Sequence, residues 1–158
     1  MSRQRHKTVL FRPLPSPHLS PMEKSFVDVL TKLHNLSGAA QLAHWNITGP
    51  EFPQYHELFA RIYGMADGHI DPMAEQARGS GVEIPAKIFH DVPEIDWANG
   101  KELVEELYKV VEELCEALDK LHKDADSAEE YGILNIVEGL MTDTRTMKYL
   151  LGSVIEKF

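Results

Sequence analysis

Residues 44–75 read HWNITGPEFPQYHELFARIYGMADGHIDPMAE, and this stretch holds four side chains of the kinds that bind iron and similar divalent metals. His44 and His56 lie twelve residues apart, with a Thr48-Gly49-Pro50 break between them. Asp71 and Glu75 follow, four residues apart, so they share one face if that segment is helical. The stretch therefore predicts a metal site with two imidazole and two carboxylate ligands.

The spacing of these four residues also predicts a second chain. His44 ends one apolar-periodic segment and His56 lies near the start of the next, so a short turn can bring them together. Asp71 lies fifteen residues beyond His56, roughly 22 Å along a helix that rises about 1.5 Å per residue. If all four are ligands, the carboxylates should face the histidines of an antiparallel partner. A packed histidine and an exposed acidic helix face remain the alternatives.

Helices are expected on both sides of the break. Residues 21–47 follow a capping box, Ser20-Pro21-Met22-Glu23, and repeat apolar residues every three to four positions. Residues 52–79 form the second helix. Its Pro72 removes a backbone donor inside the helix and predicts a kink or local widening beside the two carboxylates.

The second half of the chain predicts two more helices. A connection of about 18 residues after Gly79-Ser80-Gly81 suggests a crossover with a short helix of its own. The third helix opens at Asn99-Gly100-Lys101-Glu102 and runs to about His122. Residues 123–128 form a turn, and a capping box from Ser127 to Glu130 opens the fourth helix. Four long helices with the one long connection in the middle predict an all-α, ferritin-like four-helix bundle over residues 20–158.

Composition limits the class of protein. The chain has 158 residues, enough for one domain, and no apolar run approaches the roughly 18 residues that cross a bilayer, so no membrane partner is expected. A single cysteine, Cys115, fits a reducing, cytoplasmic setting. The net charge of −9 argues against a nucleic-acid-binding body.

Residues 1–19 differ from the rest and are expected to form a basic, proline-rich extended arm. The first 21 residues carry four basic side chains and no acidic one, which leaves 12 basic against 25 acidic side chains elsewhere. The arm either contacts DNA phosphates or is a solvated or subunit-packing tail. The candidate DNA contacts are Arg3, Arg5, Lys7 and Arg12.

The quoted stretch resembles the Dps-type miniferritins, ferritin relatives also called DNA-binding proteins from starved cells. Three runs carry the resemblance: residues 44–52, residues 56–59, and residues 71–78. The resemblance covers the chain after the arm and implies a hollow dodecamer built from two-fold dimers. In such a shell, iron(II) is oxidised by peroxide or oxygen between subunits and stored as ferric mineral. His44 and His56 would come from one subunit, and Asp71 and Glu75 from its partner.

The resemblance implies further roles. Trp45 would be an electron donor, with a packed interface aromatic as the alternative. Four acidic residues would line an iron-entry pore, with a solvated helix cap as the alternative: Asp124, Asp126, Glu129 and Glu130. Many relatives carry an acidic residue where this chain has Ala60, so the second iron position has one ligand fewer. Family arms are usually lysine-rich and this one has a single lysine, so DNA binding stays open.

Two other classes are weighed against this interpretation. Larger ferritins build a di-iron site within one bundle from Glu-x-x-His motifs, and no such motif occurs in this chain. A non-enzymatic DNA-compacting or structural shell protein is supported by the basic arm alone.

Overall fold

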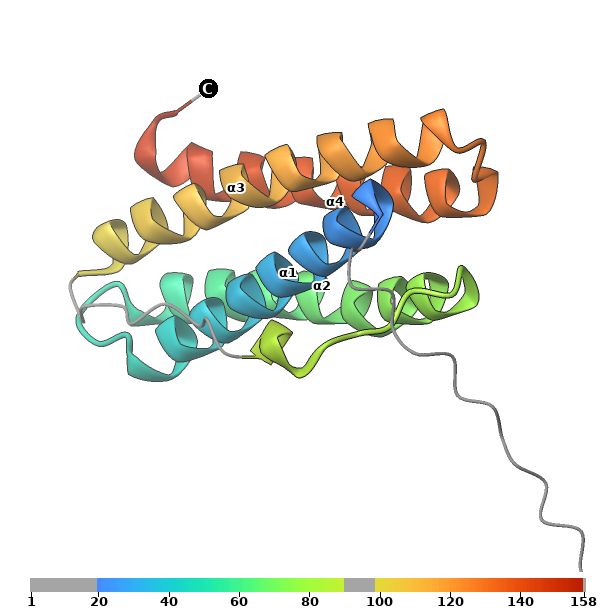
Figure 1. Cartoon of the computed structure of the whole chain (residues 1–158). Coiled ribbons are helices and arrows are strands. Elements are labelled where there is room, and N and C mark those ends of the chain that lie inside the picture. The colour runs from blue at the N-terminus through green and yellow to red at the C-terminus, as the bar shows by residue number, and fades with distance from the viewer. Residues whose placement is uncertain (1–19, 90–98, 158) are drawn as a thin grey trace, which may run out of the picture.

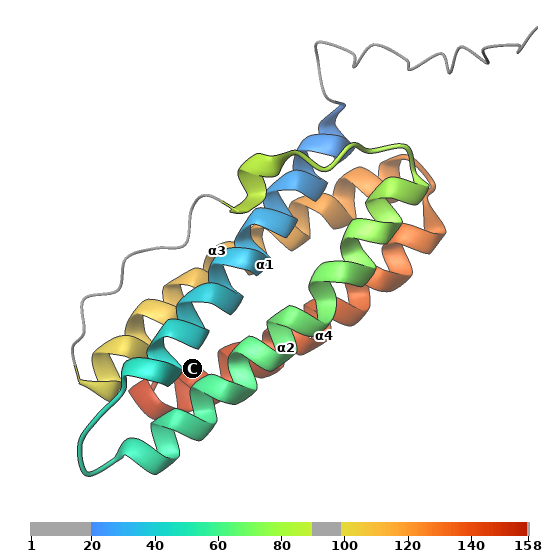
Figure 2. The same cartoon turned by 90° about the horizontal axis from the view of Figure 1, so that it is seen from below.

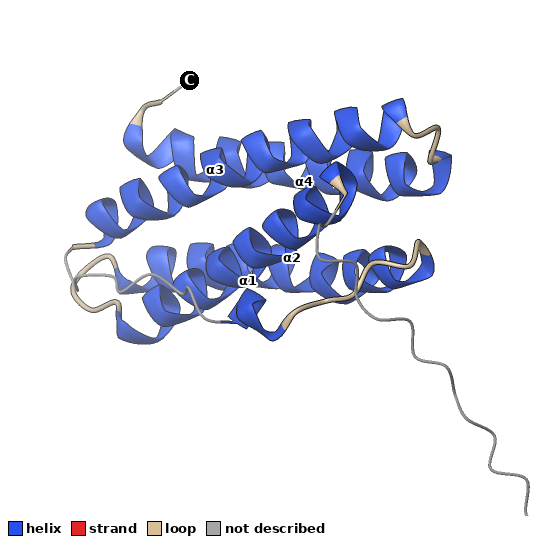
Figure 3. Cartoon of the chain, viewed as in Figure 1, coloured by secondary structure: helices blue, strands red, loops and turns tan. Residues whose placement is uncertain are grey.

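Four long helices make up most of the computed structural model, which describes residues 20–89 and 99–157. They are α1 (Pro21–Asn46), α2 (Phe52–Gly79), α3 (Gly100–Ser127) and α4 (Tyr131–Ile155), with a short 3₁₀ helix, η1 (Ala86–Phe89), after α2. Within the described residues the chain is helix and loop without strand (Figure 3). The all-α four-helix prediction is confirmed, and so is the short helix in the crossover.

The helices form two antiparallel hairpins packed into a bundle. The α1–α2 pair and the α3–α4 pair lie one against the other in Figure 1. α1 packs against both α2 and α3, while α4 packs against α3 and α2. η1 lies against α1 on the outside of the bundle (Figure 2). Among the described residues, none of the helices combines the length and apolar content needed to cross a membrane.

The predicted apolar stripes form the core. Leu30, Leu33 and Phe59 are fully buried, and so are Leu114 and Leu140 on the second hairpin. Burying a side chain of this size contributes about 1.5–3 kcal/mol relative to leaving it exposed, so the stripes hold the two hairpins together. Val154, near the end of α4, is exposed.

Local signals set the starts of α1 and α3. The Ser20 hydroxyl accepts from the Glu23 amide, and the Glu23 carboxylate accepts from the Ser20 amide, so the predicted capping box is present. The Asn99 side chain accepts from the Glu102 amide at the start of α3. Gly100 follows directly, and a Cβ there would overlap the Tyr55 ring of α2. A glycine is therefore needed where the two hairpins meet.

The turn between α3 and α4 differs from the prediction. α3 continues to Ser127, five residues beyond His122, and Ser127 donates to the Lys123 carbonyl instead of capping α4. The predicted third capping box is wrong: α4 begins after Glu130, whose side chain makes no cap bond. Ala125 in this additional turn is fully buried, so the last turn of α3 packs into the core.

A Schellman motif closes α3. The Glu129 amide donates to the Asp126 carbonyl and the Glu130 amide to the Ala125 carbonyl. Glu129 has φ of 57°, the left-handed conformation that glycine usually supplies at this position. The sequence offered no glycine there, which hid the end of the helix.

Pro72 lies inside α2. The α-helix is continuous from Phe52 to Gly79, so the local widening that was one of the two predicted effects of Pro72 is absent, while the predicted kink stays a prediction. α1 ends at Asn46, one residue before the predicted end.

Candidate metal centre

The turn between α1 and α2 brings two histidines together. Gly49 has φ of 106°, a conformation that other residues rarely adopt, and its carbonyl accepts from the Phe52 amide. Ile47, just after α1, is buried and anchors the turn to the core. His44 in the last turn of α1 thereby lies against His56 in the second turn of α2.

The two imidazoles are stacked and bonded reciprocally. Their ring centroids are 3.6 Å apart, with 23° between the ring planes. His44 Nδ1 lies 2.7 Å from the His56 carbonyl oxygen, and His56 Nδ1 lies 2.8 Å from the His44 carbonyl oxygen. A carbonyl oxygen only accepts, so each Nδ1 carries a proton and donates it. In the neutral rings, both Nε2 atoms then keep a lone pair for a ligand.

This bonding pattern is typical of metal-binding histidines. Such histidines donate one ring N–H to a carbonyl or carboxylate, which fixes the tautomer and the ring orientation. Here each histidine is oriented by the backbone of the other. The backbone of α1 and α2 therefore fixes the orientation of both rings.

Two more aromatic rings contact the imidazole pair. Phe52 stacks on His56 with ring centroids 4.6 Å apart. Tyr63 packs edge-on against His44 with ring centroids 5.4 Å apart and 68° between the planes. The contact between Tyr63 and His44 had no signal in the sequence, because it joins two different helices.

The two carboxylates lie apart from the histidines. Asp71 and Glu75 are exposed, further along α2. Within residues 20–89 and 99–157 of one chain, no three His, Cys, Asp or Glu side chains lie close enough to hold a metal. The single chain therefore brings together only His44 and His56 of the four predicted ligands, as the length of α2 led us to expect.

The predicted electron donor and the predicted pore residues lie in different environments. Trp45 is 63% exposed and, among the described residues, makes no ring contact with either imidazole. Asp124 is half-buried, and its carboxylate accepts from the Ser25 hydroxyl of α1 at 2.5 Å. The other three acidic residues of the predicted pore are exposed at the α3–α4 turn: Asp126, Glu129 and Glu130.

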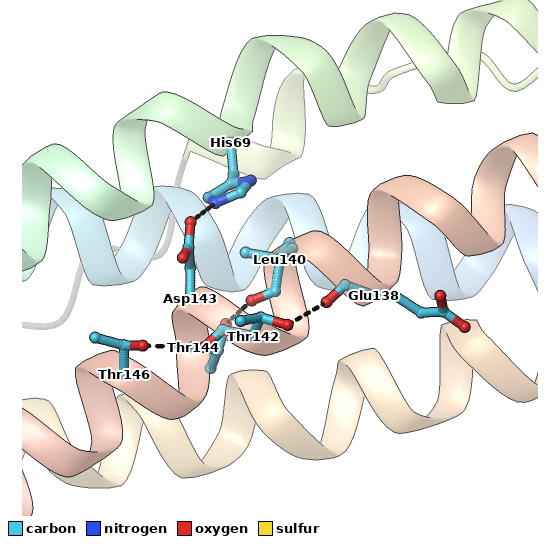
Figure 4. Close-up of polar contacts among 7 residues, drawn as sticks. All are labelled: His69, Glu138, Leu140, Thr142, Asp143, Thr144 and Thr146. Atoms are coloured by element: carbon cyan, nitrogen blue, oxygen red, sulfur yellow. Dashed lines mark hydrogen bonds and ion pairs between the residues drawn. The ribbon is translucent and has the colours of Figure 1, made fainter.

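A second histidine–carboxylate pair lies away from this site. His69 Nε2 of α2 lies 2.7 Å from Asp143 Oδ2 of α4 and joins the two hairpins (Figure 4). His69 lies two residues before Asp71 and therefore on a different face of α2. Asp143, 74 residues further on, gave no signal. The nearby α4 hydroxyls of Thr142, Thr144 and Thr146 donate to backbone carbonyls four residues earlier.

His34 occupies a third environment on α1. Its ring packs against Phe89 of η1 with centroids 4.6 Å apart. Burial lowers the pKa of His34, and the charge of Asp67 on α2 partly opposes that shift.

The candidate DNA contacts Arg3, Arg5, Lys7 and Arg12 lie outside the described residues.

Comparison with known proteins places the chain in a family. The ferritin-like domain family matches residues 24–158. A Brevibacillus brevis protein described as "DNA protection during starvation protein" is 30% identical over 109 residues, which cover 67% of this chain and 68% of that protein. The "DNA protection during starvation protein 2" of Bacillus anthracis is 25% identical over 135 residues, 82% of this chain and 88% of that protein.

Solved structures share the fold at lower identity. The X-ray structure of Dps from Thermosynechococcus elongatus matches with a TM-score of 0.79 at 17% identity, covering 87% of this chain and 91% of that chain. A ferritin-like, diiron-carboxylate protein from Bacillus anthracis matches with a TM-score of 0.76 at 14% identity, covering 84% and 94%. The family match over residues 24–158 and the relative that is 30% identical show that the chain belongs to the ferritin-like family and is a Dps-type miniferritin.

Proposed function

We propose that this protein binds Fe(II), oxidises it with hydrogen peroxide or oxygen at sites between subunits, and stores the ferric product inside a hollow shell. One observation carries the proposal: two stacked imidazoles whose Nδ1 atoms both lie on backbone carbonyls and whose Nε2 atoms make no hydrogen bond within residues 20–89 and 99–157. Imidazole together with carboxylate is a ligand set suited to iron.

A second copy of the chain completes the site in this proposal. Asp71 and Glu75 are exposed and lie about 22 Å or more along α2 from His56, so they serve a partner that runs antiparallel. A two-fold interface is the same patch on both subunits, so each dimer holds two sites. Each site takes His44 and His56 from one chain and both carboxylates from the other.

The chemistry needs two electrons for each peroxide. Two Fe(II) ions, one peroxide and two protons give two Fe(III) ions and two waters. The imidazoles hold the ferrous ion through Nε2, and the carboxylates offset the charge that increases as iron is oxidised. Ala60 supplies no ligand, so the second iron is held more weakly than the first.

Assembly, entry and storage extend the proposal. Two-fold dimers assemble into a dodecameric shell in the cytoplasm, with iron entering past the exposed carboxylates of the α3–α4 turn. Asp126, Glu129 and Glu130 are exposed at that turn, as this path requires. Asp124 is the weakest of the four candidates because Ser25 already occupies its carboxylate.

Subunit complementation tests the shared site directly. His44→Ala/His56→Ala chains and Asp71→Ala/Glu75→Ala chains are each purified, then dissociated and reassembled together. Each variant alone should lose peroxide-driven iron oxidation, followed by ferric absorbance after anaerobic Fe(II) loading. In random mixed dimers, half of the dimers are hybrid and each hybrid regains one intact site of two, so activity should return to about a quarter of the parent level.

The outcomes separate the alternatives. A reassembled mixture as inactive as its components would overturn the shared site, because ligands within one chain cannot complement. Light scattering before and after mixing confirms that the assembly has reformed. His122→Ala serves as the matched control, since His122 pairs with Glu138 on α4 and not with a proposed ligand.

DNA binding is a second candidate function. The names of the matched relatives refer to DNA protection, and residues 1–12 of this chain carry four basic side chains without an acidic one. If the arm binds phosphates, deletion of residues 1–19 abolishes salt-sensitive retention of DNA in a gel shift assay. The acidic body repels DNA, so unchanged retention after deletion would eliminate this function for the arm.

A further inference from the structure

One stretch of α2 packs less into the core than the rest of the helix. From Phe59 onward, buried residues of α2 recur every three or four positions, except between Ala66 and Met73. Across that gap of nearly two helical turns no side chain is buried, and His69 is one of two that are half-buried. Asp71 lies in the same gap and is exposed. Core packing therefore holds α2 least firmly beside the proposed carboxylate ligands.

The backbone of the same stretch is also weakened. Pro72 has no N–H, so the Gly68 carbonyl lacks the hydrogen bond that the residue four positions later usually donates. Gly68 is itself a poor helix former. The orientation of this turn therefore depends more on the contacts that α2 makes with other helices.

The His69 side chain makes such a contact. Its Nε2 lies 2.7 Å from Asp143 Oδ2 on α4, and it donates because a carboxylate only accepts (Figure 4). Among the described residues, this is the sole side-chain hydrogen bond or ion pair that joins α2 to α4. The His69 side chain is 20% exposed, so the bond is shielded from water on the α2 side. The bond ties the weakest stretch of α2 to the second hairpin.

His69 and the proposed ligands lie on opposite sides of α2. A helix turns about 100° per residue, so Asp71 lies about 200° and Glu75 about 240° around the axis from His69. Both carboxylates are exposed, whereas His69 faces α4. A tether on one side of the helix therefore sets the direction in which the carboxylates point on the other.

We propose that the His69–Asp143 hydrogen bond fixes the rotation of α2 and so positions Asp71 and Glu75 for the histidines of a second chain. The inference rests on the proposed shared site and adds a positioning pair to it. Side chains reach about 5–6 Å from a helix axis, so a rotation of about 10° displaces a carboxylate by about 1 Å. A displacement of that size can cost about a hundred-fold in rate.

The proposal confines the effect to one chain of each dimer. The tether acts on carboxylates that its own chain gives to the partner's site, so its loss should harm that site alone. His56 of the same chain lies thirteen residues before His69, about 20 Å away along α2. A general loss of stability would instead act equally from either chain.

Mixed assemblies test this difference. Chains with Asp71→Ala/Glu75→Ala supply only histidines, and chains with His44→Ala/His56→Ala supply only carboxylates, so each hybrid dimer holds one complete site. Asp143→Leu removes the acceptor and is added to one chain type or to the other before the two are dissociated and reassembled. Co(II) binding is followed by visible absorption without peroxide, and iron oxidation by ferric absorbance with peroxide. Light scattering reports assembly, and urea unfolding reports stability.

On the carboxylate-supplying chain, Asp143→Leu should weaken Co(II) binding and slow iron oxidation about ten-fold to a hundred-fold. On the histidine-supplying chain it should leave both at the level of the mixture without it. Asp143→Asn keeps an acceptor oxygen and should restore both readouts. His69→Phe keeps a flat ring without the donor and should reproduce the one-sided loss. Glu138→Leu is the matched control, because it breaks the His122–Glu138 pair between α3 and α4 and should change neither readout.

Other outcomes overturn the positioning role. Equal losses from both chain types would mean that the bond contributes only general stability, and no loss from either would mean that α2 needs no tether. Asp143→Asn chains as impaired as Asp143→Leu chains would exclude the hydrogen bond as the cause. If Asp143→Leu chains fail to assemble, His69→Phe chains decide by the same comparison. A mixture without these changes that neither binds Co(II) nor oxidises iron above its separate components would instead remove the proposed shared site itself.

Discussion

The turns that close the two helical hairpins both contain a residue with positive φ, but the residue type differs. Both turns need a residue with positive φ: Gly49 at 106° between α1 and α2, and Glu129 at 57° between α3 and α4. The first turn uses the residue that adopts this conformation without strain, and it carries the stacked imidazoles beside it. The second carries exposed acidic side chains and tolerates a strained glutamate. Low strain therefore coincides with the turn whose geometry the proposed chemistry needs.

The largest effect is expected from Gly49→Ala, which would make the first turn resemble the second. A Cβ at φ of 106° is strained although nothing lies within 4 Å of it, so the cost is conformational, about 1–2 kcal/mol of unfolding free energy. Relief of that strain shifts α2 relative to α1 and separates the two imidazoles. Urea unfolding should show the lost stability, and peroxide-driven iron oxidation should fall with it. Full iron oxidation despite the lost stability would show that the histidine pair does not depend on this turn.

A smaller and opposite effect is expected from Glu129→Gly, which would make the second turn resemble the first. Glycine adopts the left-handed conformation freely and keeps both amide bonds of the Schellman motif, so unfolding free energy should rise by about 0.5–1 kcal/mol. Thermal and urea unfolding measure the change. Iron oxidation at the dimer site should stay at the parent rate, while loss of a carboxylate from the proposed entry path should slow uptake into an assembled shell. Glu129→Ala keeps the positive φ and separates the charge effect from the backbone effect.

The smallest effect concerns pH and the α1–η1 contact, away from both turns. Burial lowers the folded-state pKa of His34, with partial opposition from Asp67. The unfolded chain therefore binds more protons, and stability should fall as pH drops from about 6.5 through the folded-state pKa of His34. Unfolding midpoints of the parent and of His34→Gln, measured from pH 7.5 to 5, should diverge in that window, with the parent losing more stability. Parallel curves would show that His34 contributes nothing to the pH dependence.

Local patterns in the sequence predicted much of this protein. The capping box at Ser20 and the apolar stripes placed α1, α2 and the core, because both depend on residues within a few positions of one another. The spacing of His44 and His56 about a Gly-Pro break predicted their contact for the same reason. The distance from His56 to Asp71 also predicted that, within the described residues of one chain, the four candidate ligands do not all come together.

Contacts between distant residues decided the rest. The last turn of α3 buries Ala125 in the core, and the Schellman turn places a glutamate where a glycine would have been predicted. The reciprocal carbonyl bonds that fix both imidazole tautomers, and the Tyr63 ring against His44, arise only when α1 and α2 pack together. The sequence determined which candidate ligands the protein carries and on which helices they lie. The tertiary structure decided how the histidines are oriented and which aromatic ring touches them, because those properties depend on side-chain packing between helices and not on spacing along one.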